Sequence, residues 1–468
     1  LLPSEANNYL VSIFIQEDGG EQIAGLALAD ITTGEFAVTE FSGENISSAL
    51  RSELTRIKPA EILYPDSQPL ALGLVGHLTK WPAWRFELGR CQQVLMSHFE
   101  IATLAGFGLH DQPAGVRAAG AIIQYLGETQ PSSLKLLTGL STYSLADFMI
   151  LDAATRRNLE LTETIRSGSV KDSLLGILDQ TITPMGKRLI RQWVTKPLLD
   201  VLSIHNRLDQ VELFYTDGML RAQIRVELKK LADLERLTNR VVAGSAQPRD
   251  LVAIRSALQQ LPTLKQIIPE GRTALTPVLD QFYLCSDELS LVESAISDEP
   301  PATLHNVGVI RSGYSAELDG VLERSRHARE WIANLESVER QRTGIKTLKV
   351  GYNKVFGYYL ELTRANAGMA PQEYIRKQTL VNAERFITPE LKELEHSILT
   401  AQDRRLELEY ALFVQIREQL TKQDQRLLQT AEVLAQLDVL ACFAELAVRH
   451  RYCRPSLNQN RNITICEG

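Results

Sequence analysis

The side chains best suited to chemistry in this sequence are basic and polar ones between residues 344 and 390, starting with KTLKVGYNKVFGYYLEL at 346–362. This segment holds seven Lys or Arg and four Glu, a net charge of +3, in a chain whose net charge is −7. A basic segment on an acidic protein favours a polyanion as partner. The residues that we predict to contact phosphate oxygens are Lys349, Asn353, Lys354, Arg376, Lys377, Gln378, Thr379, Asn382 and Arg385. A solvated hairpin would show the same local charge, so charge alone leaves both interpretations open.

Alternation divides this segment between the two faces of a small sheet. One face would carry Leu348, Val350 and Tyr352, continued after Gly357 by Tyr358, Leu360 and Leu362, and the other would carry Lys349, Gly351 and Asn353. We therefore expect the aromatic residues to form the core of the sheet, because base-stacking platforms are usually exposed. The predicted binding is to the backbone of a nucleic acid, independent of base sequence and weakened by salt.

Asp30, in the stretch ALADITTG, raises the alternative of a metal-dependent nuclease. Such an enzyme needs several carboxylates that converge on two cations. Glu35, Glu53 and Asp66 are available, but their spacing specifies none of them, and Asp30 is interpreted as a turn-capping residue. The chain has no GxxxxGK[ST] loop and no ligand spacing among its eight histidines. We therefore assign it no catalytic residue, no metal and no cofactor.

Five scattered cysteines argue against a disulfide framework and for a reducing compartment. They are interpreted as small apolar fillers and are Cys91, Cys285, Cys442, Cys453 and Cys466. No run of about 18 apolar residues and no signal peptide are present, so we expect no membrane partner and a cytoplasmic location. The chain starts at Leu1 rather than Met and ends at Gly468 just after an apolar run, which indicates a fragment.

The elements that would position these side chains change in period along the chain. Residues 1–142 read as α/β with a mixed sheet, and the predicted elements are strands at 9–15, 23–31, 34–41 and 61–66 and a helix at 46–57. From about 143 the period is helical. The predicted helices are 147–161, 183–195 with Thr183 as N-cap and Pro184 at the first position, 204–216, 219–242, 248–261, 279–297 and 431–450, followed by a strand-like 463–466.

Heptad-like patterns lie on both sides of the basic segment and predict an antiparallel helical arm. The positions are Leu318, Val321, Ser325, Ala328, Ile332 and Leu335 before it, and Leu391, Leu394, Ile398, Ala401, Arg405, Leu408 and Leu412 after it. Each helix would be roughly 45 Å long, with the basic insert at the far end. Such an arm also suits a protein-interaction scaffold, although Ser325 and Arg405 interrupt the heptads.

Several stretches of the sequence, in a fixed order, carry a resemblance to a known family. They are LDAATRRNLEL (151–161), LDQTITPMGKRLIRQWVTKPL (178–198), LKVGYNKVFGYYLELTR (348–364), YIRKQTLVNAERFITPELKELE (374–395) and AELAVRHRYCRPSL (444–457) with ITICEG (463–468). Together they resemble the bacterial-type MutS family of mismatch-recognition ATPases. The resemblance covers essentially the whole chain and is loosest over the first ~90 residues. Phe443 and Glu445 match the family's Phe-x-Glu wedge in type but not in position, and they are interpreted as core.

The resemblance implies a multidomain α/β plus mainly α architecture. Its parts would be a ribonuclease H-like connector (1–142), a helical core with the outgoing lever (143–345), a β clamp (346–388), the returning lever with the rest of the core (389–452), and the start of an ATPase domain (453–468). It implies a mismatch-repair scaffold whose clamp contacts double-stranded DNA, with MutL and a second copy as partners of the full-length protein. ATP and Mg²⁺ would belong to the full-length protein, and this fragment would not be an enzyme.

Overall fold

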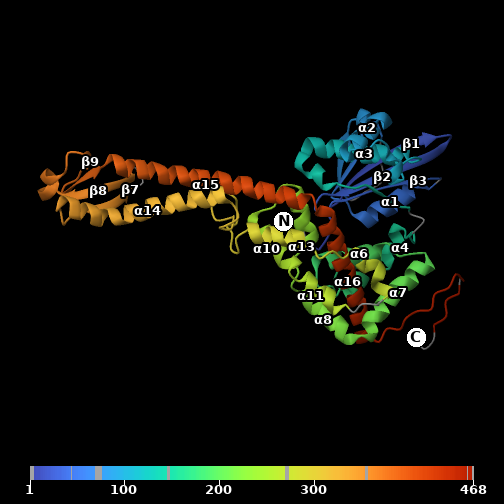
Figure 1. The fold of residues 1–468 in the computed structure, drawn as a ribbon. Helices are drawn as coiled ribbons and strands as arrows, with labels where there is room; N and C mark the ends of the chain where they lie inside the picture. The colour runs from blue at the N-terminus through green and yellow to red at the C-terminus, as the bar shows by residue number, and fades with distance from the viewer. Residues whose placement is uncertain are drawn as a thin grey trace. The chain divides into compact units, whose positions relative to one another are not determined.

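The computed structural model describes residues 5–43, 45–68, 76–144, 148–268, 273–353, 357–460 and 462–465. Lys354 and Cys466 therefore lie outside the described residues. The chain, drawn in Figure 1, folds as two units. One comprises Leu1–Ala246, Ala253–Leu289 and Arg417–Gly468, and the other comprises Gln247–Val252 and Ser290–Ile416.

The first unit begins with a six-stranded mixed sheet, as the sequence predicts. Its strands are β1 (Leu10–Asp18), β2 (Glu21–Asp30), β3 (Glu35–Ser42), β4 (Glu61–Pro65), β5 (His77–Trp81) and β6 (Ser141–Thr142). The order across the sheet is β5-β4-β1-β2-β3-β6. The first three strands are antiparallel neighbours, whereas β4 runs parallel to β1, β5 to β4 and β6 to β3.

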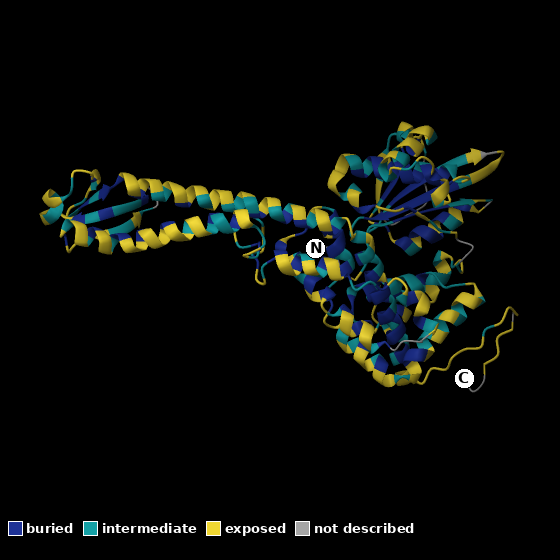
Figure 2. Ribbon diagram, in the orientation of Figure 1, coloured by how far each residue is buried: buried dark blue, intermediate teal, exposed yellow. Residues whose placement is uncertain are grey.

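Helices cover both faces of this sheet (Figure 2). Helix α1 (Ile46–Ile57) has the predicted bounds and packs Leu50 and Leu54 against Val11 and Ile13. On the opposite face, α2 (Leu88–Phe99) and α3 (Pro113–Thr129) share a core with Phe14 and Val38. A Cβ on Gly25 would lie 2.1 Å from the backbone of Ala114, so the close approach of α3 to β2 requires glycine there.

The rest of this unit is mainly helical. Its α-helices are α4 (Ala153–Asn158), α5 (Leu174–Leu178), α6 (Pro184–Thr195), α7 (Val201–Thr216), α8 (Gly218–Leu228), α9 (Leu234–Val242), α11 (Leu261–Ile267), α12 (Thr276–Leu279) and α16 (Asp424–His450). Helix α16 is buried along most of its length and contacts α6, α7, α8 and α9. A helix apolar on nearly all sides is the usual centre of such a bundle. No helix among the described residues is long and apolar enough to cross a membrane.

Short 3₁₀ helices complete the elements, together with two helices that, like α15 (Pro389–Thr421), have residues in both units. They are η1 (Ala83–Phe86), η2 (Leu104–Phe107), η3 (Pro131–Leu136), η5 (Thr273–Leu275), η6 (Arg364–Met369), α10 (Pro248–Leu258) and α13 (Ser286–Ala295).

Four predicted elements are wrong in extent. The helix predicted at 279–297 is only α13, because residues 280–285 are not helical. The helix predicted at 147–161 is only α4, because Phe148 forms an isolated bridge with Leu198 and the side chain of Asp152 caps the helix start by accepting from the Thr155 amide at 2.6 Å. The helix predicted at 219–242 breaks into α8 and α9, and Asp233 caps the second. The strand-like stretch 463–466 has no regular secondary structure in its described residues, 463–465.

The second unit contains the predicted antiparallel arm. Helix α14 (Ala316–Thr343) leads into four strands, and α15 (Pro389–Thr421) returns from them. Helix α14 spans 28 residues, about 42 Å at 1.5 Å per residue. The predicted seam is buried at Leu318, Val321, Ala328, Ile332 and Leu335 in α14 and at Leu391 and Ile398 in α15.

Candidate nucleic-acid interface

The basic segment forms a small antiparallel sheet held between the two arm helices. Its strands are β7 (Lys349–Asn353), β8 (Gly357–Thr363), β9 (Ile375–Thr379) and β10 (Ala383–Ile387), in the order β7-β8-β10-β9. Leu348, Leu360 and Leu362 are 0% exposed and share a core with Leu335 of α14 and Leu391 of α15. One face of the sheet is therefore fixed against the helices, which leaves the other face for contacts outside the unit.

A row of polar side chains crosses that other face through all four strands. Lys349 in β7 lies opposite Glu361 in β8, Glu361 lies opposite Arg385 in β10, and Arg385 lies opposite Gln378 in β9. Arg385 donates from Nε to Glu361 at 2.9 Å and from Nη1 to Gln378 at 3.0 Å. Its guanidinium also lies 4.2 Å from the ring centre of Tyr359. Arg385 is therefore held in place by three neighbours.

The other cations predicted to contact phosphate differ in their exposure and in whether they form an ion pair. Lys349 and Lys377 are exposed, and neither makes an ion pair among the described residues. Arg376 is paired with Glu384 at 2.9 Å, although 59% of its side chain remains exposed. The exposed, unpaired lysines are thus the side chains best able to neutralise phosphate charge.

The remaining predicted residues occupy the sheet edge and its turns. Thr379 and Asn382 are exposed near the turn that joins β9 to β10. Asn353 is half-buried at the end of β7 and has an interaction partner of its own. Lys346 and Arg364 are also exposed in this segment and were not among the predicted contacts, although their charge was a usable signal.

The prediction that the aromatic residues of 346–362 form the core holds for Tyr358, which packs against it. Tyr374 and Phe386, which were not part of that prediction, are buried in the core. Tyr352 is 57% exposed, so its predicted core position is wrong. It lies one residue from the end of β7, with its ring centre 4.9 Å from that of Tyr358. Tyr359 lies on the opposite face across Gly351, where an added Cβ would be 2.6 Å from its ring.

A network of hydrogen bonds, buried at Tyr374 and Glu339 and exposed at Arg342 and Glu373, ties the sheet to α14. The hydroxyl of Tyr374 donates to Glu339 at 2.6 Å, and Arg342 donates to both Glu339 and Glu373. Burial and the bond to Glu339 raise the pKa of Tyr374, and the bond to Arg342 lowers the pKa of Glu373. Because Glu339 is 6% exposed, these two donors replace the water that its carboxylate oxygens would otherwise bind.

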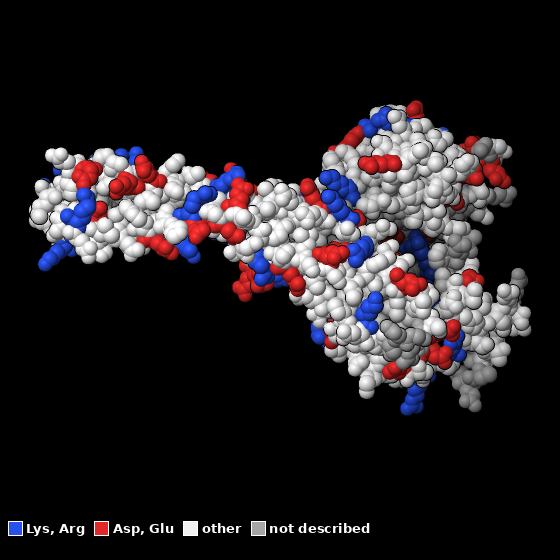
Figure 3. Space-filling view, in the orientation of Figure 1, with Lys and Arg blue, Asp and Glu red and all other residues white. Residues whose placement is uncertain are grey.

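Charges on the arm are mixed in sign. On the face drawn in Figure 3, Lys and Arg at the sheet end of the arm are interspersed with Asp and Glu. The net charge of the segment is positive, but no continuous basic patch covers the visible face. Individual exposed lysines, rather than a broad positive field, are therefore the feature that favours a polyanion.

Asp30 has the turn-capping role that the sequence indicates. It is 0% exposed, and its carboxylate accepts from the backbone and hydroxyl of Thr32 at 2.8 and 2.7 Å and from the Asn8 amide at 3.0 Å. Among the described residues, no group of three or more His, Cys, Asp or Glu is arranged to hold a metal ion. Nothing in this part of the chain therefore supports the nuclease alternative.

The cysteines are free thiols where the structure describes them. Burial raises the pKa of Cys91 and Cys442 to about 12 and that of Cys285 to about 11, which fits the predicted role as apolar fillers. Cys453 is exposed, so the filler interpretation is wrong for it. Phe443 is half-buried and packs on Trp193 with ring centres 6.1 Å apart, as expected for a residue at the core. Glu445 pairs with Arg221 but keeps 30% of its side chain exposed, so the core interpretation is wrong for it.

The chain contains a mixed β-sheet covered by helices, a helical bundle, and a long pair of helices that carries a small sheet with exposed lysines. This combination defines a multidomain protein with a helical arm. A family model described as MutS domain III matches residues 154–444, and one described as MutS domain II matches residues 8–138. The chain belongs to the MutS family.

Similarity to individual relatives extends over the whole chain. DNA mismatch repair protein MutS of Alkaliphilus oremlandii (strain OhILAs) is 42% identical over 479 residues, which cover 100% of this chain and 54% of the relative. The protein of the same name from Symbiobacterium thermophilum is 42% identical over 463 residues, 97% of this chain and 52% of the relative. The chain thus spans about half the length of the curated relatives it matches.

Proposed function

We propose that this chain is the scaffold and DNA-clamp part of a mismatch-repair protein, and that residues 346–388 contact the backbone of double-stranded DNA. The observation that carries the proposal is the position of Lys349 and Lys377. Lys349 lies on the face of the sheet opposite the one buried against the two arm helices, and Lys377 lies at the register irregularity of β9. Both are exposed, and neither makes an ion pair among the described residues. A rigid support with mobile cations suits contact with phosphates, whose spacing does not depend on sequence.

Under this proposal the clamp residues divide by role. Lys349, Lys377 and the partly exposed Arg376 would contact phosphates, with Thr379 and Asn382 as neutral donors. Arg385 would act as a positioning residue, because its guanidinium is already engaged by Glu361, Gln378 and Tyr359. Asn353, Lys354 and Gln378 stay as predicted contacts. No step requires a base edge, so binding would be independent of sequence.

The finer assignments follow the same proposal. The strand order β5-β4-β1-β2-β3 supports a ribonuclease H-like connector in residues 1–142, and α14 with α15 would be the lever. Homodimerisation, contact with MutL and the use of ATP with Mg²⁺ are proposed for the longer protein. This chain would then contribute the arm that places the clamp on the duplex.

Fluorescence anisotropy of a labelled duplex at low salt tests the clamp assignment. We compare the chain with a Lys349→Glu/Lys377→Glu variant and with a Lys229→Glu/Lys422→Glu control. The control changes the net charge equally at exposed lysines in the other unit. If two phosphate contacts are lost, the slope of log K against log salt falls by about 2, and it falls only in the clamp variant.

Equal binding by the clamp variant and the control would overturn the proposal and favour the protein-interaction scaffold instead. Two duplexes of unrelated sequence should bind with the same affinity. A strong preference between them would contradict the assignment of backbone contacts. Circular dichroism confirms that the variants are folded, which is expected because the substituted lysines are exposed.

A further inference from the structure

A second basic site lies in the first unit. A cavity of about 560 Å³ opens between α1 and residues 153–165. Its volume is within the range of small-molecule sites, which are usually ~300–1,000 Å³. Apolar side chains, including Leu54, Leu161 and Ile165, form part of its wall, and threonine hydroxyls lie among them.

The lining of this cavity has a marked excess of positive charge. Five of its residues are basic and one, Glu163, is acidic. Lys58 pairs with Glu163, which uses the one carboxylate of the lining. Arg56 is bound by Glu53, behind the wall, through a 2.8 Å bond from Nε and a second contact from Nη2.

Three arginines of the lining, Arg51, Arg156 and Arg157, remain without a carboxylate partner among the described residues. Arg51 and Arg157 are exposed at the rim. Arg156 is half-buried, and its Nε donates to the Leu151 carbonyl at 2.9 Å, which satisfies a hydrogen bond but leaves the charge unneutralised.

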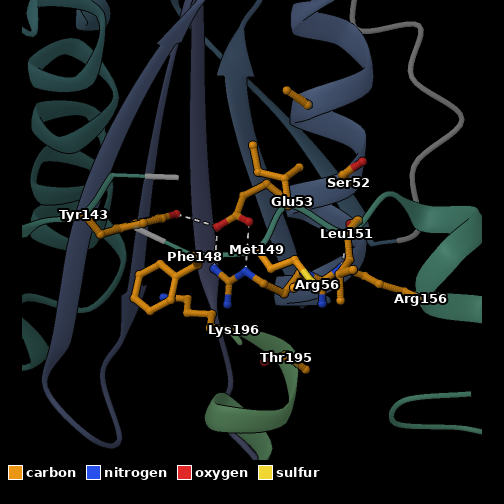
Figure 4. A pocket seen from close by; sticks show the side chains of 12 residues that line it. Ser52, Glu53, Arg56, Tyr143, Phe148, Met149, Leu151, Arg156, Thr195 and Lys196 are labelled. Atoms are coloured by element: carbon orange, nitrogen blue, oxygen red, sulfur yellow. Dashed lines mark hydrogen bonds and ion pairs between the residues drawn. The ribbon is translucent and has the colours of Figure 1, made fainter. Parts of the chain in front are cut away.

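A cluster of further charged residues behind the cavity wall adds to this excess of positive charge. Figure 4 shows the guanidinium of Arg56 against the carboxylate of Glu53, to which the Tyr143 hydroxyl also donates at 2.7 Å, with Arg156 and Lys196 nearby. Burial and the charge of Arg56 lower the pKa of Arg156, and the same two causes lower the pKa of Lys196 to about 8. Cations that destabilise one another in this way would be stabilised by an anion.

From this juxtaposition we propose that the cavity binds a phosphate-bearing small molecule of about the size of a mononucleotide. Arg51, Arg156 and Arg157 would hold the phosphate, since guanidinium groups form bidentate hydrogen bonds with phosphate oxygens. The apolar wall at Leu54, Leu161 and Ile165 would pack against the rest of the molecule. This role is separate from the proposed contact with DNA, because none of these residues belongs to the arm.

Isothermal titration calorimetry of the 468-residue chain tests the site, with AMP, inorganic phosphate and adenosine as separate probes. We expect one AMP per chain, weaker binding of phosphate and the weakest binding of adenosine. Arg51→Ala/Arg157→Ala should weaken AMP binding at least about tenfold, because two charge-assisted contacts are lost. Lys229→Ala/Lys422→Ala, which removes two exposed charges elsewhere in this unit, should leave it unchanged.

Two competition experiments and one further variant complete the design. Equal competition by sulfate at matched ionic strength would indicate an adventitious ion only and overturn the proposal. Displacement of AMP by duplex DNA at equal phosphate concentration would overturn it in favour of a nucleic-acid surface. Lys349→Glu/Lys377→Glu should bind AMP normally, so failure of the DNA proposal leaves this one standing. Equal AMP affinity in Arg51→Ala/Arg157→Ala and its control would contradict the assigned residues.

Discussion

The carboxylate of Asp438 in α16 caps the start of α6, 255 residues earlier in the chain. Its Oδ2 accepts from the Thr183 amide at 2.6 Å and from the Thr183 hydroxyl at 2.8 Å, and the Ile182 amide donates to the same carboxylate. Asp438 is 0% exposed, and burial raises its pKa. A side chain of α16, the central helix of the bundle, thus accepts hydrogen bonds from backbone N–H groups at the start of α6, which would otherwise have no partner.

Replacing this carboxylate should loosen α6. Asp438→Asn places an amide NH₂ near the two backbone N–H groups and removes the charge that favours them at the helix start. We expect a loss of about 2 kcal/mol in local stability, typical of a buried donor left unsatisfied. Hydrogen exchange of the amides in α6 and α16 measures it directly, since a chain of two units need not unfold in one step.

The matched control for Asp438→Asn is Glu432→Gln, a carboxylate-to-amide change on an exposed position of the same helix. Its effect on exchange should stay within about 0.5 kcal/mol. Equal protection of α6 in the two variants would show that the Asp438 cap contributes nothing measurable.

Sequence signals correctly predicted those structural features that depend on interactions within one helical turn. Thr183 followed by Pro184 correctly marks the start of α6, because an N-cap hydroxyl and a proline at the first position act within one turn. The partner Asp438 could not be found this way, since the contact depends on the packing of α16. The helix predicted over Phe148 was wrong for the same reason, because the pairing of Phe148 with Leu198 overrides a helical pattern.

The candidate interface was predictable to the same extent. Alternation placed Leu348, Leu360 and Leu362 on the buried face, and Lys349 on the other. It could not show that Arg385 is engaged by Glu361, because that pairing depends on the register between β8 and β10 and on the irregularity after Arg385. The basic cavity beside α1 joins residues about 100 positions apart, so no spacing rule would have indicated it.

Removing the hydroxyl of Tyr374 should weaken the attachment of the small sheet to α14. Tyr374→Phe leaves the buried carboxylate of Glu339 with Arg342 as its remaining side-chain donor. The expected cost is about 1–3 kcal/mol, the range for hydrogen bonds to charged groups. Faster amide exchange in β9 and β10 would report it. Tyr410→Phe, at a tyrosine 55% exposed on α15, is the control and should leave exchange unchanged.

Lys196 should make stability depend on pH above neutrality. Its folded pKa is lowered to about 8, first by burial and then by Arg56, whereas Glu53 and Glu35 act in the opposite direction. Between that value and the unfolded pKa of about 10.4, the unfolded state binds more protons, so this group's contribution to stability rises with pH. From pH 7.5 to 9.5 we expect a gain of about 1–2 kcal/mol relative to Lys196→Met.

Chemical denaturation of the two proteins at each pH measures this difference in the transition of the unit that contains Lys196. The range stops at pH 9.5 because burial raises the pKa of Tyr143 well above its usual value, and the ionisation of tyrosines in the unfolded state would lower stability at higher pH. Parallel pH profiles for the chain and Lys196→Met would contradict the lowered pKa.

Arg405, which interrupts the heptad pattern of the arm, should stabilise the arm rather than weaken it. Arg405 replaces an apolar residue at the seam, and its Nε donates to Glu409 at 2.7 Å. Glu409, 2% exposed, also accepts from the amides of Gly308 and Val309, each at 2.7 Å. One buried carboxylate therefore ties the loop before α14 to α15 through two backbone donors and one cation.

Glu409→Ala removes the acceptor of both backbone donors and should lower the stability of the arm by about 2–4 kcal/mol. The control is Glu407→Ala, at a carboxylate whose side chain is 70% exposed, and it should lower stability by less than about 0.5 kcal/mol. Arg405→Leu restores an apolar heptad position, yet it leaves Glu409 without its cation and should still destabilise the arm by about 1 kcal/mol or more. Hydrogen exchange of the amides in residues 316–335 and 398–412 measures all three variants. Greater protection in Arg405→Leu than in the unsubstituted chain would mean that seam packing outweighs the ion pair, and the stabilising role of Arg405 would be wrong.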